Sequence, residues 1–210
     1  MPIIKHVKVD ESCSWCLWYI EEDEKMLWQQ LGLLSIPPDF SNISNPIKKL
    51  EWIASRLSLK YLINTHGCSF GPIYKDDFGK PFFSKEHHIS LAHSYPYAAA
   101  IFNHHLPTGI DLEKVQPKLI KVAHKYLSPD EIADVKEDAA KACVYWTAKE
   151  ALFKMHGRKK ISFKEHLAIA PFHLQPTGIV AAKAIIDNKP LHHKIQYYTI
   201  NEYYLSICLA

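Results

Sequence analysis

Two short stretches in the second half of the chain decide how it is expected to fold. Residues 109–113 read Gly-Ile-Asp-Leu-Glu, and residues 146–154 read Trp-Thr-Ala-Lys-Glu-Ala-Leu-Phe-Lys. The first stretch alternates apolar and acidic residues, which is typical of a β-strand. The second has apolar residues at helical spacing and predicts part of a long helix.

Strand alternation places Asp111 and Glu113 on one face and Ile110 and Leu112 on the other. Two neighbouring carboxylates repel each other, and a cation relieves that repulsion. Hard divalent ions accept oxygen ligands of this kind. Taken alone, the same pattern also fits an edge strand that turns its polar face to water.

The helical stretch places Trp146, Glu150 and Lys154 on one face at successive i to i+4 steps. An acid is therefore held next to a base. The alternative is a surface Glu-Lys pair, with Trp146 and Phe153 in the core.

Outward from these stretches, each half of the chain reads as β segments, then helices, then β segments, which predicts two related α+β lobes, residues 1–107 and 108–210. In the first half the expected strands fall within residues 3–20, 89–92 and 97–102, and the expected helices within 21–34 and from Pro46, capped by Ser44 or Asn45. In the second half helices are expected over 117–127 and 128–155, and strands over 109–113, 161–169, 179–184, 195–200 and 203–209.

The composition narrows the class of protein. With 210 residues, 48% of them hydrophobic, the chain has ample material for a core, and a net charge of +3 does not indicate a nucleic-acid binder. The thirteen histidines are scattered, and most of them are interpreted as surface or loop residues. Five cysteines indicate a reducing compartment, and Cys13 and Cys16 are expected to be strand residues rather than zinc ligands. Without a signal peptide or membrane span, the protein is expected to be cytoplasmic.

Three further motifs complete a pattern: Gly-Lys-Pro at 79–81, His-Ser at 93–94 and Leu-Ser-Pro-Asp-Glu at 127–131. In this order and spacing the motifs resemble the 4'-phosphopantetheinyl transferase superfamily. The resemblance runs from about Lys48 to the C-terminus, and the length resembles the longer, two-lobe, surfactin-synthetase-activating type. It implies an α+β fold of two similar lobes related by pseudo-twofold symmetry. Each lobe would be a small antiparallel sheet packed with helices, with the active site in the cleft between the lobes of a monomer.

The resemblance also implies the activity. The enzyme would transfer the phosphopantetheine group of coenzyme A to a serine hydroxyl of an apo acyl or peptidyl carrier protein, giving the holo carrier and 3',5'-ADP. Asp111, Glu113 and Glu150 would bind Mg2+, or Mn2+ in its place. Glu150 and Lys154 are the expected catalytic residues, Lys154 touching a phosphate oxygen, and whether Glu150 is also the general base stays open.

Coenzyme A is expected to contact residues from both halves. Its 3'-phosphate would meet His93 and a base from Lys48, Lys49 or Arg56, with no choice among the three. Lys80 and Pro81 would line the adenine or phosphate entrance, and Ser94, Lys149 and Lys154 complete the predicted binding set.

Two rival interpretations remain: a metal-dependent phosphodiesterase or nuclease, and a catalytically silent module that binds carrier proteins. The sequence does not indicate whether the carrier serves fatty-acid, polyketide or peptide synthesis.

Overall fold

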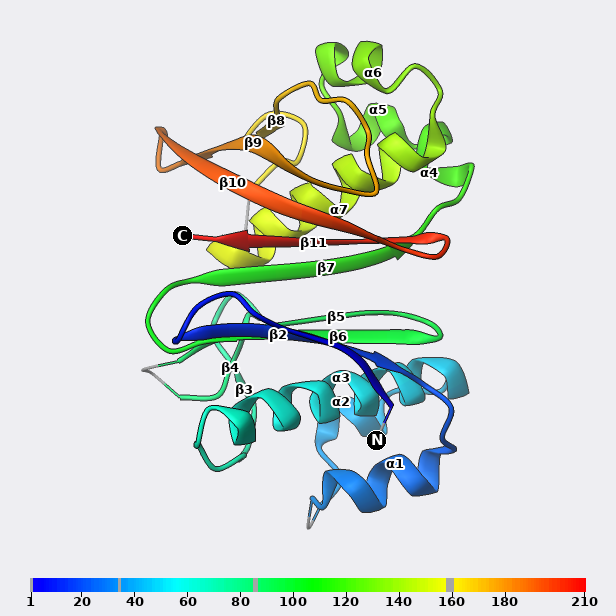
Figure 1. Cartoon of the computed structure of the whole chain (residues 1–210), viewed down its shortest axis with the longest axis vertical. Helices are drawn as coiled ribbons and strands as arrows, with labels where there is room; N and C mark the ends of the chain where they lie inside the picture. Colours follow the sequence, from blue (N-terminus) through cyan, green and yellow to red (C-terminus); the bar gives the residue numbers. More distant parts are fainter. Residues whose placement is uncertain (1, 34, 85–86, 158–160) are drawn as a thin grey trace. The chain divides into compact units, whose positions relative to one another are not determined.

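The computed structural model describes residues 2–33, 35–84, 87–157 and 161–210, and the chain divides into two compact units (Figure 1). The first unit comprises Met1–Tyr74 and Phe82–His105, and the second comprises Lys75–Pro81 and Leu106–Ala210. Within the described ranges, no helix has both the length and the apolar character needed to cross a bilayer.

The first unit is an antiparallel sheet with helices packed against it. Its strands are β1 (Ile3–Lys8), β2 (Cys13–Tyr19), β5 (His88–Ser94) and β6 (Tyr97–Asn103), in the order β1-β2-β6-β5. The long helix α3 (Pro46–Thr65) packs on β6, β2 and β5, and α1 (Glu24–Leu31) packs on α3. The short elements are α2 (Pro38–Ser41), β3 (Tyr74–Lys75) and β4 (Pro81–Phe82).

Local chemistry fixes where α3 begins. The Asn45 side chain accepts hydrogen bonds from the backbone N–H groups of Ile47 and Lys48, and Pro46 occupies the first turn, where its missing N–H costs nothing. Of the two expected caps, Asn45 is therefore the one used. Cys13 and Cys16 are fully buried residues of β2, as predicted.

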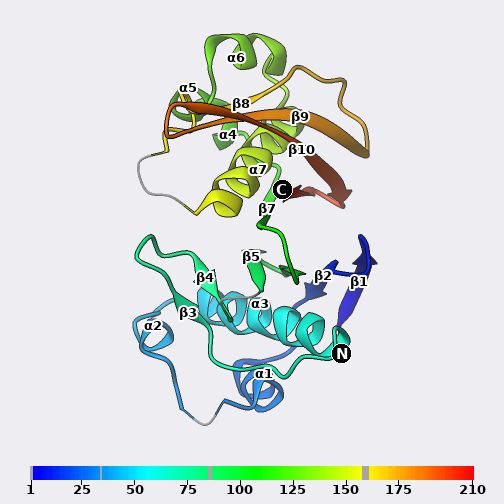
Figure 2. The same ribbon diagram turned by 90° about the vertical axis from the view of Figure 1, so that its left-hand side faces the viewer.

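The second unit is a larger antiparallel sheet packed on one long helix (Figure 2). Its strands are β7 (Thr108–Lys114), β8 (Leu167–Ile169), β9 (Thr177–Ile186), β10 (Lys189–Ile200) and β11 (Tyr203–Leu209), in the order β7-β11-β10-β9-β8. Helix α7 (Ala139–His156) packs on β7 and β11. Three short helices precede it: α4 (Lys118–Lys121), α5 (Ala123–Tyr126) and α6 (Pro129–Val135).

Both units share one connection pattern. In each, the strand before the long helix pairs with the last strand of the unit, and that strand pairs with the one before it: β2-β6-β5 in the first unit and β7-β11-β10 in the second. The predicted α+β class is confirmed. The pseudo-twofold relation between the lobes stays a prediction.

Two expected elements differ from the structure. The helical region 128–155 is broken, because Lys136 and Glu137 adopt positive φ angles of 49° and 64° and Asp138 then caps α7. The strand expected over 161–169 is limited to Leu167–Ile169. Before it the chain turns, with the Ser162 N–H donating to His166 Nδ1 and the His166 N–H donating to the Ser162 carbonyl.

Gly109 controls the distance between β7 and α7. A Cβ atom at this position would lie 1.9 Å from the Ala151 carbonyl oxygen and 2.8 Å from the Met155 nitrogen, both of them backbone atoms of α7. Backbone atoms cannot move aside as a flexible side chain can. The glycine of the motif is therefore needed for close packing of the strand on the helix, not for a turn.

Gly109→Ala is expected to destabilise the protein by about 3 kcal/mol or more, because β7 must move away from α7. Gly71→Ala is a matched control, since its Cβ would meet only the Phe83 side chain at 3.5 Å. Urea unfolding of both variants measures the difference, and equal stabilities would contradict the close-packing argument.

Candidate functional site

The face of β7 that meets α7 carries the acidic residues of the motif. Residues alternate along a strand, so Asp111 and Glu113 share the face on which Gly109 approaches the helix. Ile110 and Leu112 lie on the opposite face and are buried. The expected alternation is therefore present, and it turns the acids toward α7.

Lys154 of α7 joins the helix to this strand. Its Nζ lies 2.6 Å from Asp111 Oδ1 and 3.2 Å from the Ile110 carbonyl oxygen. Both side chains are largely shielded, with exposed fractions of 29% for Lys154 and 11% for Asp111. This one ammonium group lies at a site with several acids.

Glu150 lies one helical turn before Lys154. Burial and the negative charge of Asp111 raise its pKa to about 7, with a smaller contribution from Glu113, while Lys154 opposes the shift. The three predicted metal-binding acids are therefore close enough to repel one another. We call Asp111, Glu113, Glu150 and Lys154 the acidic cluster.

The chemistry of the acidic cluster fits a divalent cation. Three carboxylates against one lysine leave two formal negative charges in excess, and Asp111 and Glu113 add to burial in raising the pKa of Glu150. The donors are all oxygens, which suits Mg2+ or Mn2+. Within the described chain their oxygens do not all lie within 4.8 Å of one another, so sharing one ion requires the side chains to draw together.

Lys149, predicted to bind coenzyme A, has structural partners in the core of the second unit, and its predicted role stays a prediction. It is fully buried, and its Nζ donates to Glu131 Oε2 at 2.6 Å and to the carbonyl oxygens of Tyr126 and Phe163. Glu131 also accepts from the backbone N–H groups of Ser128 and Ile169. Adjacent helical residues point about 100° apart, so Lys149 enters the core while Glu150 does not.

Trp146 is a packing residue. Its ring contacts Tyr126 at 5.0 Å and Phe163 at 5.8 Å between centroids. The interpretation that places Trp146 and Phe153 against the core is confirmed for both residues. The packing of these two aromatic residues leaves the surroundings of Glu150 unchanged, since its charged neighbours are the two acids of β7 and Lys154.

The Gly-Lys-Pro motif also contacts α7. The Lys80 ammonium donates to the Met155 carbonyl in the last turn of the helix, where a cation interacts favourably with the helix dipole. Burial lowers the pKa of Lys80. Pro81 begins β4. Their predicted part in coenzyme A binding stays a prediction, since Lys80 has a structural partner here.

The first unit holds a second cluster of charged residues around Glu51, a buried acid of α3. Lys48 Nζ lies 2.7 Å and His93 Nδ1 lies 3.3 Å from Glu51 Oε2, and the Tyr95 N–H donates to Oε1. Burial alone would raise the pKa of Glu51, but the bonds from His93 and Lys48 lower it to about 2. We call Lys48, Glu51, His93 and Tyr95 the Glu51 cluster.

This cluster separates the three basic residues that the sequence left as alternatives. Lys48 shares Glu51 with His93. Lys49 lies 3.9 Å from Glu24 and over the Phe40 ring. Arg56 stacks on Trp52 at 3.4 Å and pairs with Asp39. Lys48 is therefore the base that lies beside His93, and Ser94 follows His93 at the end of β5.

Sequence reasoning missed Glu51. The signal was available, because Glu51 lies three residues after Lys48 on a predicted helix, which places the two side chains on one face. Its link to His93 was not visible, because 42 positions and several turns of chain separate the two residues.

A protein-family model and two known proteins that match this chain all concern the same class of enzyme. Residues 107–208 match the model of the 4'-phosphopantetheinyl transferase superfamily. A 4'-phosphopantetheinyl transferase named gsp from Aneurinibacillus migulanus is 29% identical over 126 residues, which are 57% of this chain and 52% of that protein. A 4'-phosphopantetheinyl transferase from Bacillus subtilis is 26% identical over 157 residues, which are 71% of this chain and 66% of that protein.

Over residues 107–208 the chain is thus similar to the 4'-phosphopantetheinyl transferase superfamily, as the motifs indicated. The matched region contains every residue of the acidic cluster, whereas the Glu51 cluster lies before it. The alignments span about half to two thirds of the length of these two relatives.

Lys149→Met is expected to lower the free energy of unfolding by about 3–5 kcal/mol, because it leaves the buried Glu131 carboxylate without its cation. Lys125→Met makes the same substitution at an exposed lysine of α5 and should change stability by less than about 0.5 kcal/mol. Chemical denaturation compares the two. If Lys149→Met were as stable as its control, the buried pair would not hold this part of the unit together.

Proposed function

We propose that this protein transfers the 4'-phosphopantetheine group of coenzyme A to a serine hydroxyl of an apo carrier protein, releasing 3',5'-ADP. The match of residues 107–208 to the superfamily model supports the proposal, and the two relatives carry the name of this activity. The observation that assigns the activity to particular residues is the acidic cluster, in which β7 and α7 bring together acids from two motifs.

Asp111, Glu113 and Glu150 are the proposed ligands of one Mg2+ ion, with Mn2+ as the alternative. The excess negative charge of the cluster and its all-oxygen donors support this assignment. When bound, the ion supplies charge neutralisation for the pyrophosphate of coenzyme A and for the oxygen that leaves.

Lys154 has the second role in the cluster. If Asp111 served as a metal ligand, its ion pair with Lys154 would be weakened, and the Lys154 ammonium group would be able to reach a phosphate oxygen. Lysine serves this purpose as a point charge on a flexible stem. Lys154 therefore binds and neutralises phosphate, and it needs no proton transfer to do so.

Glu150 is the proposed acceptor of the serine proton, directly or through water. Its pKa of about 7 is suited to a base that works near neutral pH. A tightly bound metal ion lowers the basicity of the same carboxylate, so the two roles of Glu150 oppose each other and are left as alternatives.

The Glu51 cluster is the proposed site of the 3'-phosphate of coenzyme A. Lys48 and His93 keep exposed fractions of 56% and 39%, so both can meet a ligand while the buried Glu51 positions them. The cleft between the lobes, where one coenzyme A molecule would meet both clusters, is part of this proposal and follows from the family resemblance. The proposal also includes a monomeric, cytoplasmic enzyme whose partner is an acidic acyl or peptidyl carrier protein.

The test is a transfer assay read by intact-protein mass spectrometry. Incubation with coenzyme A, Mg2+ and an apo carrier protein is expected to add one phosphopantetheine mass to the carrier, and chelation of the metal should stop the reaction. Cleavage of coenzyme A without any mass gain on the carrier would instead favour a phosphodiesterase.

Glu150→Gln is expected to reduce transfer by about 100-fold or more, since it removes a carboxylate needed as ligand or base. Glu165→Gln makes the same change at an exposed acid of the second unit and should keep full activity. Thermal unfolding of both variants confirms that they fold. Full activity of folded Glu150→Gln would refute the proposed role of the acidic cluster.

A further inference from the structure

A thiol and two imidazoles from three separate segments converge in the first unit. Cys68, His87 and His104 each offer one ligand atom, and these atoms all lie within 4.8 Å of one another. Cys68 Sγ lies 3.8 Å from His87 Nε2. We call these three residues the Cys-His cluster. All three are partly buried.

The sheet brings the two histidines together. In the antiparallel ladder of β5 and β6, His88 is opposite Asn103. Continuing this register by one residue places His87 opposite His104, just beyond the end of the ladder. Their rings are 5.0 Å apart between centroids, and both contact the fully buried ring of Phe102.

The Cys68 thiol comes from the segment that directly follows α3. The chain leaves the helix at His66, and the Cys68 N–H donates to the Ile63 carbonyl, which fixes the position of Cys68 just past the last turn. The His104 N–H donates in the same way to the Ser12 carbonyl. Two of the three ligands therefore start from anchored backbone, and packing on Phe102 restrains both imidazole rings.

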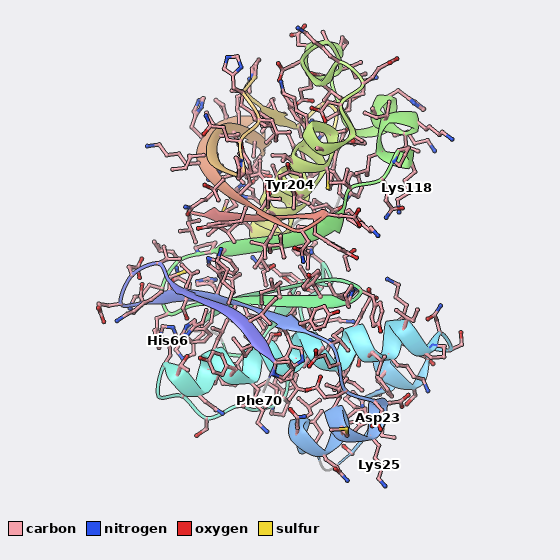
Figure 3. The ribbon with its side chains drawn as sticks, turned by 45° about the vertical axis from the view of Figure 1, so that its right-hand side comes forward. Asp23, Lys25, His66, Phe70, Lys118 and Tyr204 are labelled. Atoms are coloured by element: carbon pink, nitrogen blue, oxygen red, sulfur yellow. The ribbon has the colours of Figure 1, made fainter. Side chains whose placement is uncertain are left out.

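His66, which follows the last turn of α3 (Figure 3), borders the cluster without joining it. Its Nε2 is hydrogen bonded to Ser14 Oγ at 2.7 Å, and its ring centroid lies 5.0 Å from that of His104. His87 Nδ1 is buried and finds no hydrogen-bond partner within the described part of the chain. The other ring nitrogen, Nε2, faces Cys68 Sγ, so the His87 ring is oriented by this contact and by its packing on Phe102.

The donor set selects the kind of ion. One sulfur and two imidazole nitrogens suit Zn2+ and do not suit Mg2+, which requires oxygen ligands. A tetrahedral Zn2+ ion with bonds of about 2.3 Å to sulfur and about 2.1 Å to nitrogen has S···N edges of roughly 3.6 Å. The 3.8 Å between Cys68 Sγ and His87 Nε2 is close to that edge.

We propose that Cys68, His87 and His104 form a Zn2+ site that is separate from the acidic cluster and independent of the proposed transferase activity. The three ligands leave a fourth position for water. The ion would cross-link the end of α3 to the adjacent ends of β5 and β6, so its effect is on the stability of the first unit.

The test uses untagged full-length protein, stripped with a chelator and titrated with Zn2+ against a chromophoric competitor. One equivalent is expected to bind with submicromolar affinity and to raise the unfolding temperature. Substitution with Co2+ should give a thiolate-to-cobalt charge-transfer band in the near ultraviolet, which identifies Cys68 as a ligand.

Cys68→Ser and His104→Ala are expected to weaken Zn2+ binding at least 100-fold, whereas the control His124→Ala, an exposed histidine of α5, should bind like the unmodified protein. Circular dichroism of each stripped variant verifies its fold. Unchanged stoichiometry and affinity in folded Cys68→Ser, or the absence of the cobalt band in the unmodified protein, would overturn the proposal.

Discussion

The close packing of β7 on α7 at Gly109 is the constraint on which the acidic cluster depends. Any side chain at this position would collide with the backbone of α7 at Ala151. Because strand residues alternate, the same close approach brings Asp111 and Glu113 to the helix beside Glu150, and burial then strengthens their mutual repulsion. Lys154 offsets only part of that repulsion. The packing of β7 on α7 thus produces a site whose excess negative charge favours the binding of a cation.

Each unit carries a partly or fully buried acid on its long helix, and the two acids respond to opposite surroundings. Glu51 forms ion pairs with Lys48 and His93 and accepts a hydrogen bond from a backbone N–H, and its pKa falls to about 2. Glu150 has two other carboxylates and one lysine as neighbours, and its pKa rises to about 7. Glu51 is therefore a fixed charge that positions its neighbours, whereas Glu150 is poised to exchange a proton or take a cation.

The sequence predicted the elements whose signals are local. The alternation of residues 109–113, the Asn45 cap of α3 and the order of β segments and helices in each half all appear in the structure. Lys149 was assigned to a ligand because a motif does not reveal which neighbour of Glu150 enters the core. The Glu51 and Cys-His clusters were missed because their members come from separate segments that only the folded sheet brings together.

The titration of the Glu150 side-chain carboxyl tests the central claim most directly. Carbon-13 NMR can follow it with pH in protein labelled at glutamate, with Glu150→Gln supplying the assignment. We predict a midpoint near pH 7 in the presence of chelator, and a much lower midpoint when Mg2+ is added, because the ion favours the charged carboxylate. A midpoint near the ordinary value of 4.5 that does not respond to Mg2+ would show that Asp111, Glu113 and Glu150 do not form one site.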